Sequence, residues 1–265
     1  QDINTVRKHL TRLSGGRLAR AANGARVCAL IVSDVVGDDP THIASGPCAP
    51  DPTTCADALA ALARHDIDPP ASIRAHLEAQ GTVADTAKPG EPCFARTGNR
   101  VIANAHGSLE AAARVFEQAG IAACVLSDRV AGNAQDVAMQ HAALARTVSK
   151  RPLALISGGE TTVTLRPRHG RGGRNAEFLL ALASALNAQD AWAIACDTDG
   201  IDGSEDNAGA LLAPDTLARA RARSIDPAAY LAAHDSYGFF AALGDLVVTG
   251  PTRTNVNDYR ALLLT

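Results

Sequence analysis

Residues 192–207 read WAIACDTDGIDGSEDN, a short apolar run followed by a loop rich in carboxylates and glycines. The run predicts a buried strand, and the loop lies where the carboxyl end of that strand meets solvent. In open α/β sheets, ligands bind at such strand ends. Carboxylates this close repel one another unless a cation lies among them, and Mg²⁺ prefers oxygen ligands. Mg²⁺ is therefore a natural occupant of the loop that contains Asp197, Asp199 and Asp202, although for such a loop taken alone a solvated acidic turn is the favoured interpretation.

The composition is that of a globular chain and argues against several other classes of protein. The chain has 265 residues, of which 46% are hydrophobic, and a formal charge of −3. With no long basic run, this balance argues against nucleic acid as a partner. No uninterrupted apolar segment approaches the ~20 residues of a membrane span, so we expect no membrane partner. The six cysteines include no C-x-x-C pair, which indicates a reduced chain and a cytoplasmic location.

Predicted strands and helices alternate along the chain, which indicates a parallel, doubly wound sheet. The predicted strands cover residues 26–32, 100–103, 122–126, 153–156, 162–165, 192–196 and 246–249. The predicted helices cover residues 4–18, 56–65, 72–80, 108–118, 134–148, 176–186, 216–223 and 236–243, with another starting at 226. The sequence around residue 150 predicts a boundary, which divides the chain into residues 1–150 and 151–265. Because the chain starts without a methionine and residues 6–10 already have the pattern of the middle of an element, we expect an amino-terminal part to be missing.

Two glycine-rich segments after residue 150 are candidates for phosphate binding. SGGET at residues 157–161 separates an apolar run from a β-branched run, which predicts a strand, a turn and a strand. Its glycines would let a ligand or another backbone approach closely. The loop ending at Arg174 contains Arg166, Arg168, Arg171 and three glycines, and it leads into a predicted helix whose first N–H groups favour an anion. It matches neither a Walker A loop nor a G-x-G-x-x-G turn, and a solvated basic loop is the alternative.

The first part of the chain and the tail offer further candidates. Asp34 follows the predicted strand 26–32, in a second strand-then-acidic-loop arrangement. Ser45 and Gly46 could expose backbone N–H groups to a phosphate or carboxylate, although an ordinary Gly-Pro turn also explains them. Arg17 follows a glycine pair and could reach an anion or face solvent. The tail at residues 250–258 is dense in turn formers and in side chains that bond hydroxyls or oxyanions, and these residues also simply make turns.

Together these segments resemble one family, the glycerate 2-kinases whose carboxyl-terminal half is the MOFRL domain. The matching segments are NTVRKHL at 4–10, GGRLA at 15–19, SDVVGDDP at 33–40, IASGP at 43–47, SGGETTVT at 157–164, GRGGRNAE at 170–177, DTDGIDG at 197–203, DSY at 235–237, GPT at 250–252 and TNVND at 254–258. The resemblance spans nearly the whole chain, and the combination is far more specific than any single segment. Some members carry the older name hydroxypyruvate reductase, from tartrate utilisation.

The resemblance implies ATP-dependent phosphorylation of D-glycerate to 2-phosphoglycerate with a divalent cation. It implies an α/β fold with a doubly wound, mainly parallel Rossmann-like domain in residues 1–150, whose amino-terminal part is missing. Residues 151–265 would form a second α/β domain, the MOFRL domain, with a mixed sheet, and the active site would lie in the cleft between the domains. Family members also have an amino-terminal stretch with a lysine regarded as catalytic, which would precede Gln1 and has no counterpart here.

The resemblance assigns Arg174 to stabilise charge at the transferring phosphoryl group. In the mechanism that we expect, Asp34 or Asp197 accepts the proton of the glycerate hydroxyl, and Mg²⁺ is held by Asp197, Asp199 or Asp202. The candidates for binding nucleotide and phosphate are Gly158, Gly159, Glu160, Thr161, Gly172, Gly173 and Asn255. The candidates for binding the glycerate carboxylate are Ser45, Gly46 and Arg17. We also expect a homodimer.

Two other functions compete with the kinase. A nicotinamide-dependent hydroxypyruvate reductase would need a G-x-G-x-x-G turn after a strand, and the sequence contains none. A His–acid pair would also be common in such an enzyme, but His106 and His169, the histidines nearest the candidate loops, have no evident acidic partner in a motif. The third function is a small-molecule binding module without catalysis, which the expected loss of the amino-terminal part supports.

Overall fold

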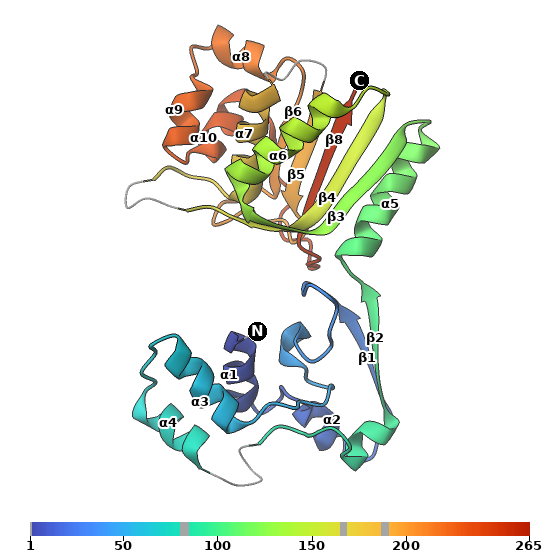
Figure 1. Ribbon diagram of the computed structural model, residues 1–265, viewed down its shortest axis with the longest axis vertical. Coiled ribbons are helices and arrows are strands. Elements are labelled where there is room, and N and C mark those ends of the chain that lie inside the picture. Colours follow the sequence, from blue (N-terminus) through green and yellow to red (C-terminus); the bar gives the residue numbers. More distant parts are fainter. Residues whose placement is uncertain (1, 80–84, 165–168, 187–190) are drawn as a thin grey trace. The chain divides into compact units, whose positions relative to one another are not determined.

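The computed structural model describes residues 2–79, 85–164, 169–186 and 191–265 (Figure 1). The chain forms two compact units, Gln1–Ala103 and Asn104–Thr265. One contains a two-stranded parallel sheet and the other a six-stranded mixed sheet, each accompanied by helices, so the predicted α/β class is confirmed. Arg166 and Arg168, which we predicted as part of a basic loop, lie outside the described residues.

The first unit combines a short parallel sheet with helices. Its elements are α1 (Asp2–Leu10), α2 (Arg17–Ala21), β1 (Val27–Val32), the 3-10 turn η1 (Ile43–Ser45), α3 (Cys55–Arg64), α4 (Ala71–Glu78), the 3-10 turn η2 (Pro92–Arg96) and β2 (Thr97–Ala103). The apolar sequence of β1 pairs in parallel with β2, from Val27 opposite Thr97 to Val32 opposite Ala103. Helix α3 begins with a capping box in which Thr54 and Asp57 satisfy each other's backbone N–H groups.

The single helix predicted over residues 4–18 is wrong, because α1 ends at Leu10 and α2 starts at Arg17. Gly16 between them has a φ of 75°, a left-handed conformation that interrupts a helix. Its N–H group donates to the carbonyl oxygen of Gly46 at 2.7 Å. A side chain on Gly16 would also clash, since its Cβ would lie 2.7 Å from Phe94. Hydrogen bonds from the glycine pair therefore connect the segment after α1 to the loop that follows β1.

The second unit is built on the six-stranded sheet, with the strand order β3-β4-β8-β5-β6-β7. Its elements are α5 (Ala105–Gln118), β3 (Ala122–Asn133), α6 (Ala134–Thr147), β4 (Leu153–Thr162), α7 (Arg174–Leu186), β5 (Ala191–Asp197), β6 (Gly209–Leu212), α8 (Thr216–Ala222), α9 (Pro227–Ala232), α10 (Ser236–Leu243), β7 (Leu246–Val247) and β8 (Asp258–Leu264). β3 and β4 are parallel, and the other neighbours in the sheet are antiparallel.

Alternating side chains of β4 face two different helix layers. Leu155 packs into the main core with residues of α6 and α7, whereas Ala154 and Ile156 pack with Leu109 of α5 in a smaller cluster. This alternation is what a strand with both faces covered requires. In Figure 1 the yellow-green α6 accordingly overlies the sheet, and α5 runs beside β3.

The division into compact units differs from the boundary predicted near residue 150. We expected residues 122–126 to belong to the sheet of residues 1–150, but β3 extends to Asn133 and pairs with β4 in the second sheet. α5, β3 and α6 consequently lie in the second unit. Within the described residues, the sheet of the first unit therefore has only two strands.

The strand–turn–strand arrangement predicted around residues 157–161 is wrong, because β4 is one continuous strand from Leu153 to Thr162. Gly159 has a φ of 105°, and a Cβ there would lie 2.3 Å from both the N and the O atom of Val130 in β3. The glycine is needed because, at this φ, a side chain would project into the backbone of β3, the neighbouring strand of the same sheet. The sequence leaves open whether a ligand or another backbone approaches these glycines, and the structure shows that it is a backbone.

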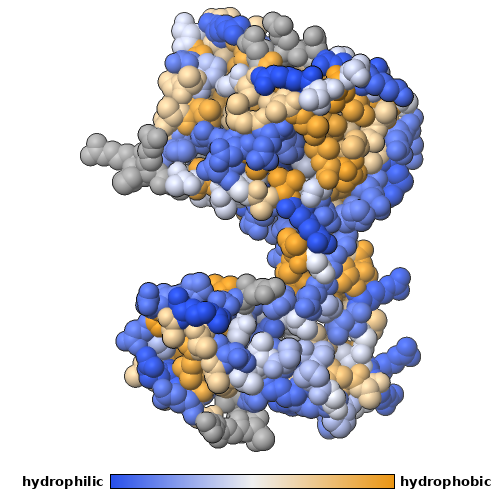
Figure 2. Space-filling view, in the orientation of Figure 1, coloured by the Kyte–Doolittle hydropathy of each residue, from blue (hydrophilic) through white to orange (hydrophobic). Residues whose placement is uncertain are grey.

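The surface of both units alternates between polar and apolar patches on the face seen in Figure 2. On the two-stranded sheet, Leu30 and Ile102 are exposed. Within the described residues, none of the helices combines the length and the apolar character that a membrane crossing requires.

Candidate functional site

The end of β5 meets the first turn of α7 in the second unit. Arg174, the first residue of α7, donates from Nη2 to Asp197 Oδ2 at 2.5 Å and from Nε to Asp258 Oδ1 at 2.8 Å. Asp197 ends β5, and Asp258 lies opposite it at the start of β8. The acidic loop and the basic loop predicted from the sequence thus converge within one unit. We call Arg174, Asp197, Asp258 and Arg260 the Arg174 centre.

Arg260 binds the second carboxylate oxygen of Asp258, the one that Arg174 does not contact. Its guanidinium, which is 2% exposed, donates from Nη2 to Asp258 Oδ2 and to Thr161 Oγ1, the latter at 3.0 Å. The Thr161 N–H group also donates to Asp258 Oδ2, at 3.3 Å. Two guanidinium groups and two carboxylates therefore compensate one another in a site largely removed from water, where an unpaired charge would be costly. These contacts fix the orientation of the Arg174 side chain.

One edge of Arg174 remains close to solvent. Its side chain is 23% exposed, and Nη1 lies 3.7 Å from Oε1 of Glu160, which is itself 62% exposed. Burial lowers the pKa of Arg174, but the charges of Asp258 and Asp197 raise it by more, so the pKa is raised overall. The guanidinium is therefore permanently charged, anchored on one side and accessible on the other.

The carboxyl group of Asp197 titrates closer to neutrality than an ordinary aspartate. Burial raises its pKa to about 6, against the opposing effects of the Asp199 N–H group, which donates to Asp197 Oδ1 at 3.1 Å, and of the Arg174 charge. Negative charges on Asp199 and Asp258 add to the increase. A carboxylate of this kind is ionised at neutral pH and is a better proton acceptor than a solvated aspartate.

Asp202 is fully buried and caps α7. Its Oδ1 and Oδ2 atoms accept the backbone N–H groups of Asn175 at 2.9 Å and Ala176 at 2.8 Å. Burial raises its pKa to about 6 in spite of these two hydrogen bonds. A Cβ on Gly173 would lie 2.3 Å from Asp202 Oδ1, so glycine is required for this close approach. The anion at the start of the helix is thus supplied by the protein itself.

This arrangement corrects two predictions. Gly172 and Gly173 were expected to border an anion site at the helix start, but the Asp202 carboxylate occupies that place, and a Cβ on Gly172 would lie 2.3 Å from Ser236 Oγ. Asp202 was expected to be a metal ligand together with Asp197 and Asp199. In the described part of the chain, the acidic loop brings no three ligand atoms within 4.8 Å of one another. A Mg²⁺ ion held by one or two carboxylates and by substrate phosphates still fits, because Mg²⁺ rarely has an all-protein cage.

The candidates on β4 and in the tail have definite places. Gly158 pairs with Tyr259 in β8, Gly159 pairs with Val130 in β3, and Thr161 is part of the contacts around Asp258. Of these β4 residues, Glu160 has its side chain exposed beside Arg174. Asn255 is exposed, and its Oδ1 atom accepts the N–H group of residue 257 at 2.9 Å, which is a turn contact.

The first-unit candidates bond largely to their own unit. The N–H groups of Ser45 and Gly46 donate to the carbonyl oxygens of His42 and Ile43, at 3.0 and 2.9 Å. The prediction that they offer these groups to an anion is therefore wrong. Arg17 donates from Nη1 to the carbonyl oxygens of Lys8 and Ser14, and burial lowers its pKa. Asp34 is exposed in the loop after β1.

Sequence reasoning missed two members of the Arg174 centre, Asp258 and Arg260. Asp258 was noticed only as the end of a turn-rich tail, and Arg260 was not singled out. The signal available was the run from Asp258 to Leu264, in which Ala261–Leu264 is apolar and could have been predicted as a strand.

Comparisons with known proteins identify relatives of the whole chain. The MOFRL family model matches residues 153–258, and a model described as a domain of unknown function (DUF4147) matches residues 1–78. A protein of Agrobacterium vitis named "Putative hydroxypyruvate reductase" is 52% identical over 99% of this chain, which spans 60% of that protein's length. A glycerate kinase of Macaca fascicularis is 32% identical over 100% of the chain and 78% of that protein.

A solved structure extends the similarity to the fold. The crystal structure of a glycerate kinase from Thermotoga maritima matches with a TM-score of 0.86 and 35% sequence identity. The match covers 100% of this chain and 63% of the Thermotoga chain.

Proposed function

The chain belongs to the glycerate kinase family that carries the MOFRL domain, and we propose that it functions in the ATP-dependent phosphorylation of D-glycerate to 2-phosphoglycerate. The names of its relatives from Macaca fascicularis and Thermotoga maritima support this activity. The structural observation that carries the proposal is the Arg174 centre. It presents a charged, oriented and partly accessible guanidinium next to a carboxylate with a raised pKa at a strand end.

Arg174 is the residue that we propose to contact the transferring phosphoryl group. Phosphoryl transfer depends mainly on positioning and on neutralising charge at the phosphoryl oxygens. Arg174 Nε and Nη2 are held by Asp258 and Asp197, which leaves Nη1, near the exposed Glu160, to donate to an incoming oxygen. A preoriented donor of this kind costs little reorganisation when charge develops.

Asp197 and Asp199 divide the remaining roles in this proposal. Asp197, with a pKa of about 6, accepts the proton of the glycerate hydroxyl, and Asp34 is the alternative base. Asp199 is intermediate in exposure and, together with the nucleotide phosphates, would hold Mg²⁺. When bound, Mg²⁺ supplies further neutralisation of phosphate charge. A cytoplasmic location and a homodimer remain predictions from the sequence.

The name of the Agrobacterium relative favours a second candidate, a nicotinamide-dependent hydroxypyruvate reductase. The sequence contains no G-x-G-x-x-G turn. At the β3–α6 junction, where such a turn would stand in a dinucleotide-binding unit, the helix is instead capped by Asn133, whose Oδ1 accepts the Gln135 N–H group at 3.0 Å. These observations favour the kinase.

A pair of assays separates the candidates. The kinase predicts ADP release that requires ATP, Mg²⁺ and D-glycerate together, and no oxidation of NADH with hydroxypyruvate. Oxidation of NADH without any ADP release would refute the kinase and support the reductase. Isothermal titration with ATP–Mg²⁺ and with D-glycerate tests the third function, because binding of both ligands without turnover would identify a binding module.

A further inference from the structure

A second group of ligand-type side chains lies in the first unit, and the proposed phosphoryl transfer does not use it. His9 is on α1, Cys55 is the first residue of α3, and Asp85 lies in the segment that follows α4. Their ligand atoms lie within 4.8 Å of one another, and His9 Nε2 is 3.7 Å from Asp85 Oδ1. We call these three residues the His9 cluster. No other group of this kind occurs among residues 2–79, 85–164, 169–186 and 191–265.

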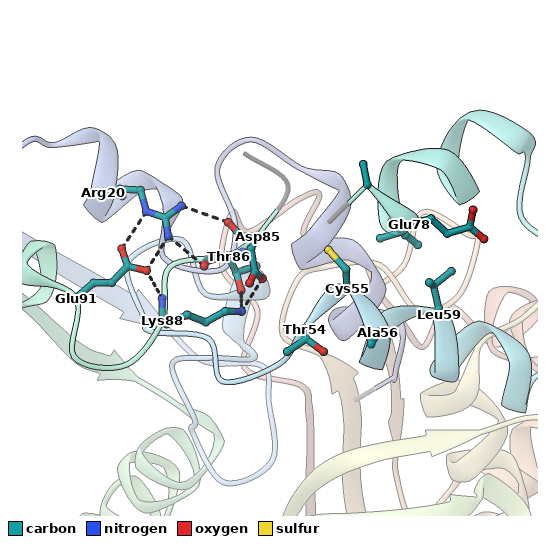
Figure 3. Close-up of a pocket in the computed structure, with 12 residues that line it drawn as sticks. Arg20, Thr54, Cys55, Ala56, Leu59, Glu78, Asp85, Thr86, Lys88 and Glu91 are labelled. Atoms are coloured by element: carbon teal, nitrogen blue, oxygen red, sulfur yellow. Dashed lines mark hydrogen bonds and ion pairs between the residues drawn. The ribbon is translucent and has the colours of Figure 1, made fainter. Parts of the chain in front are cut away.

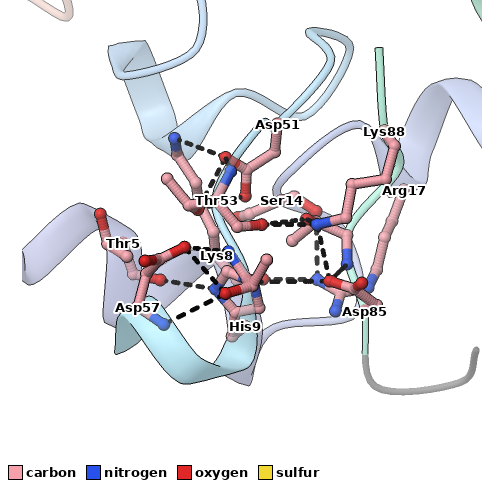
Figure 4. Close-up of polar contacts among 12 residues, drawn as sticks. Thr5, Lys8, His9, Ser14, Arg17, Asp51, Thr53, Asp57, Asp85 and Lys88 are labelled. Carbon is pink, nitrogen blue, oxygen red and sulfur yellow. Dashed lines mark hydrogen bonds and ion pairs between the residues drawn. The ribbon is translucent and has the colours of Figure 1, made fainter. Parts of the chain in front are cut away.

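The His9 ring is held in the orientation of a metal ligand. The side chain is fully buried, and Nδ1 lies 2.8 Å from the carbonyl oxygen of Thr5 (Figure 4). A carbonyl oxygen can only accept, so Nδ1 carries the proton and the lone pair of the neutral ring is on Nε2. Nε2 is buried and has no hydrogen-bond partner. Metal-bound histidines have this arrangement, in which the second ring nitrogen donates to a backbone carbonyl.

We propose that the His9 cluster binds a divalent transition-metal ion of the zinc class. An imidazole nitrogen, a cysteine sulfur and a carboxylate oxygen form a donor set typical of zinc and atypical of Mg²⁺ or Ca²⁺. Cys55 forms no disulfide. Zinc–ligand bonds of about 2.0–2.3 Å would draw the three atoms somewhat closer together. Bound metal would also satisfy the buried Nε2 atom, which otherwise has no hydrogen-bond partner.

The site has three protein ligands and an accessible side. Cys55 and Asp85 also line a cavity of about 1120 Å³, whose wall includes Thr54, Leu59 and Leu77 (Figure 3). A fourth coordination position facing this cavity would be open to water or to a small ligand. Three protein ligands with one open position is the pattern of catalytic rather than structural zinc sites.

Lys88 competes with the metal for Asp85. Its Nζ atom lies 2.7 Å from Asp85 Oδ1 and also donates to Thr86 Oγ1 at 2.8 Å. The ammonium group would therefore compete with a metal ion for this carboxylate, which lowers the affinity for the metal. Removal of Lys88 should therefore strengthen metal binding, whereas removal of a ligand should weaken it.

The test is a titration of the metal-free full chain with Co²⁺, which replaces zinc and reports thiolate ligation by a charge-transfer band in the near ultraviolet. We expect the band at one Co²⁺ per chain and its loss on addition of Zn²⁺. Cys55→Ser should abolish the band. The matched control is Cys93→Ser, which alters a half-buried cysteine of the same unit outside the cluster and should leave the band unchanged. Absence of the band in the unaltered protein, or its survival in Cys55→Ser, overturns the proposal.

Two further variants remain informative even if Cys55→Ser fails to fold. Asp85→Asn should weaken Co²⁺ binding by about tenfold or more, since removal of even an outer-shell partner typically costs 10–100-fold. Lys88→Met should tighten it. Circular dichroism checks that each variant is folded, and equal affinities for Asp85→Asn, Lys88→Met and the unaltered protein would contradict the site.

Discussion

Replacement of Gly159 by alanine should destabilise the second unit through a clash with a neighbouring strand. The Cβ would lie 2.3 Å from the N and O atoms of Val130, closer than any real contact allows. A φ of 105° is unfavourable for alanine and costs about 1–3 kcal/mol. Relief of the clash requires β3 to move away from β4, and overpacking of this kind costs about 1–3 kcal/mol more. The expected total is about 2–6 kcal/mol, a large part of the stability of an ordinary domain.

The matched control is Gly132→Ala, on the same strand pair. Gly132 has a similar φ of 120°, but a Cβ there would meet nothing closer than Val137 Cγ2 at 3.8 Å. This variant therefore carries the conformational penalty without the clash, and the difference between the two variants isolates the approach of β3. Denaturant unfolding at neutral pH measures both, with similar slopes expected. A loss for Gly159→Ala no larger than that for Gly132→Ala would refute the packing argument.

Two other predictions concern the aspartates of the acidic loop. Because the pKa of Asp197 is raised from 3.8 to about 6 and the base must be ionised, kcat/KM for D-glycerate should fall as the pH falls through about 6, and a flat rate profile across that range would exclude Asp197 as the base. Stability should change in the opposite direction. A raised pKa in the folded protein means that protonation of Asp197 favours folding, so its contribution to the free energy of unfolding rises as the pH falls from about 6 towards 3.8. Asp202→Ala should lower the free energy of unfolding by about 1–3 kcal/mol, because two buried N–H groups lose their acceptor, partly offset by removal of a buried carboxylate. Asp226→Ala, which removes the exposed cap of α9, is its control and should cost less, since water can replace the lost acceptor.

Two members of the Arg174 centre, Arg174 and Asp197, could be predicted because they stand at ends of elements that local patterns mark clearly. The apolar run before Asp197 identifies a strand end, and the glycines before Arg174 identify the start of a helix. The family resemblance then joined the two loops. Local patterns could not predict which side chain accepts the first N–H groups of α7, because tertiary packing brings Asp202 to Asn175.

The errors arose where tertiary pairing overrides local signals. A glycine pair between apolar runs ordinarily marks a turn, yet Gly158 and Gly159 are in mid-strand, where they pair with neighbouring strands of the sheet, Gly158 with Tyr259 of β8 and Gly159 with Val130 of β3. The start of β8 was missed because Asp258 ends a segment rich in turn formers and Arg260 is charged, although their mutual ion pair lets both be buried in the sheet. The division into units also depended on the pairing of β3 with β4, which no residue near 150 reveals.

The His9 cluster shows a different limit of sequence reasoning. His9, Cys55 and Asp85 come from three separate segments, and none belongs to a C-x-x-C or similar metal-binding motif. Only the fold brings their ligand atoms together. Residue spacing therefore gives no sign that these three side chains lie together.

The role of Arg174 in phosphoryl transfer is tested most directly by the rate of ADP release from ATP, Mg²⁺ and D-glycerate in Arg174→Ala, with Arg171→Ala as the control. Arg171 is an exposed arginine of the same loop, paired with Glu205, and its loss should leave turnover nearly unchanged. For Arg174→Ala we expect kcat to fall by about 10²-fold or more, the usual effect of removing a preoriented donor. Arg174→Lys should recover little activity, because an ammonium group cannot span Asp197 and Asp258 as the guanidinium does. Near-normal turnover in a folded Arg174→Ala protein would contradict the account.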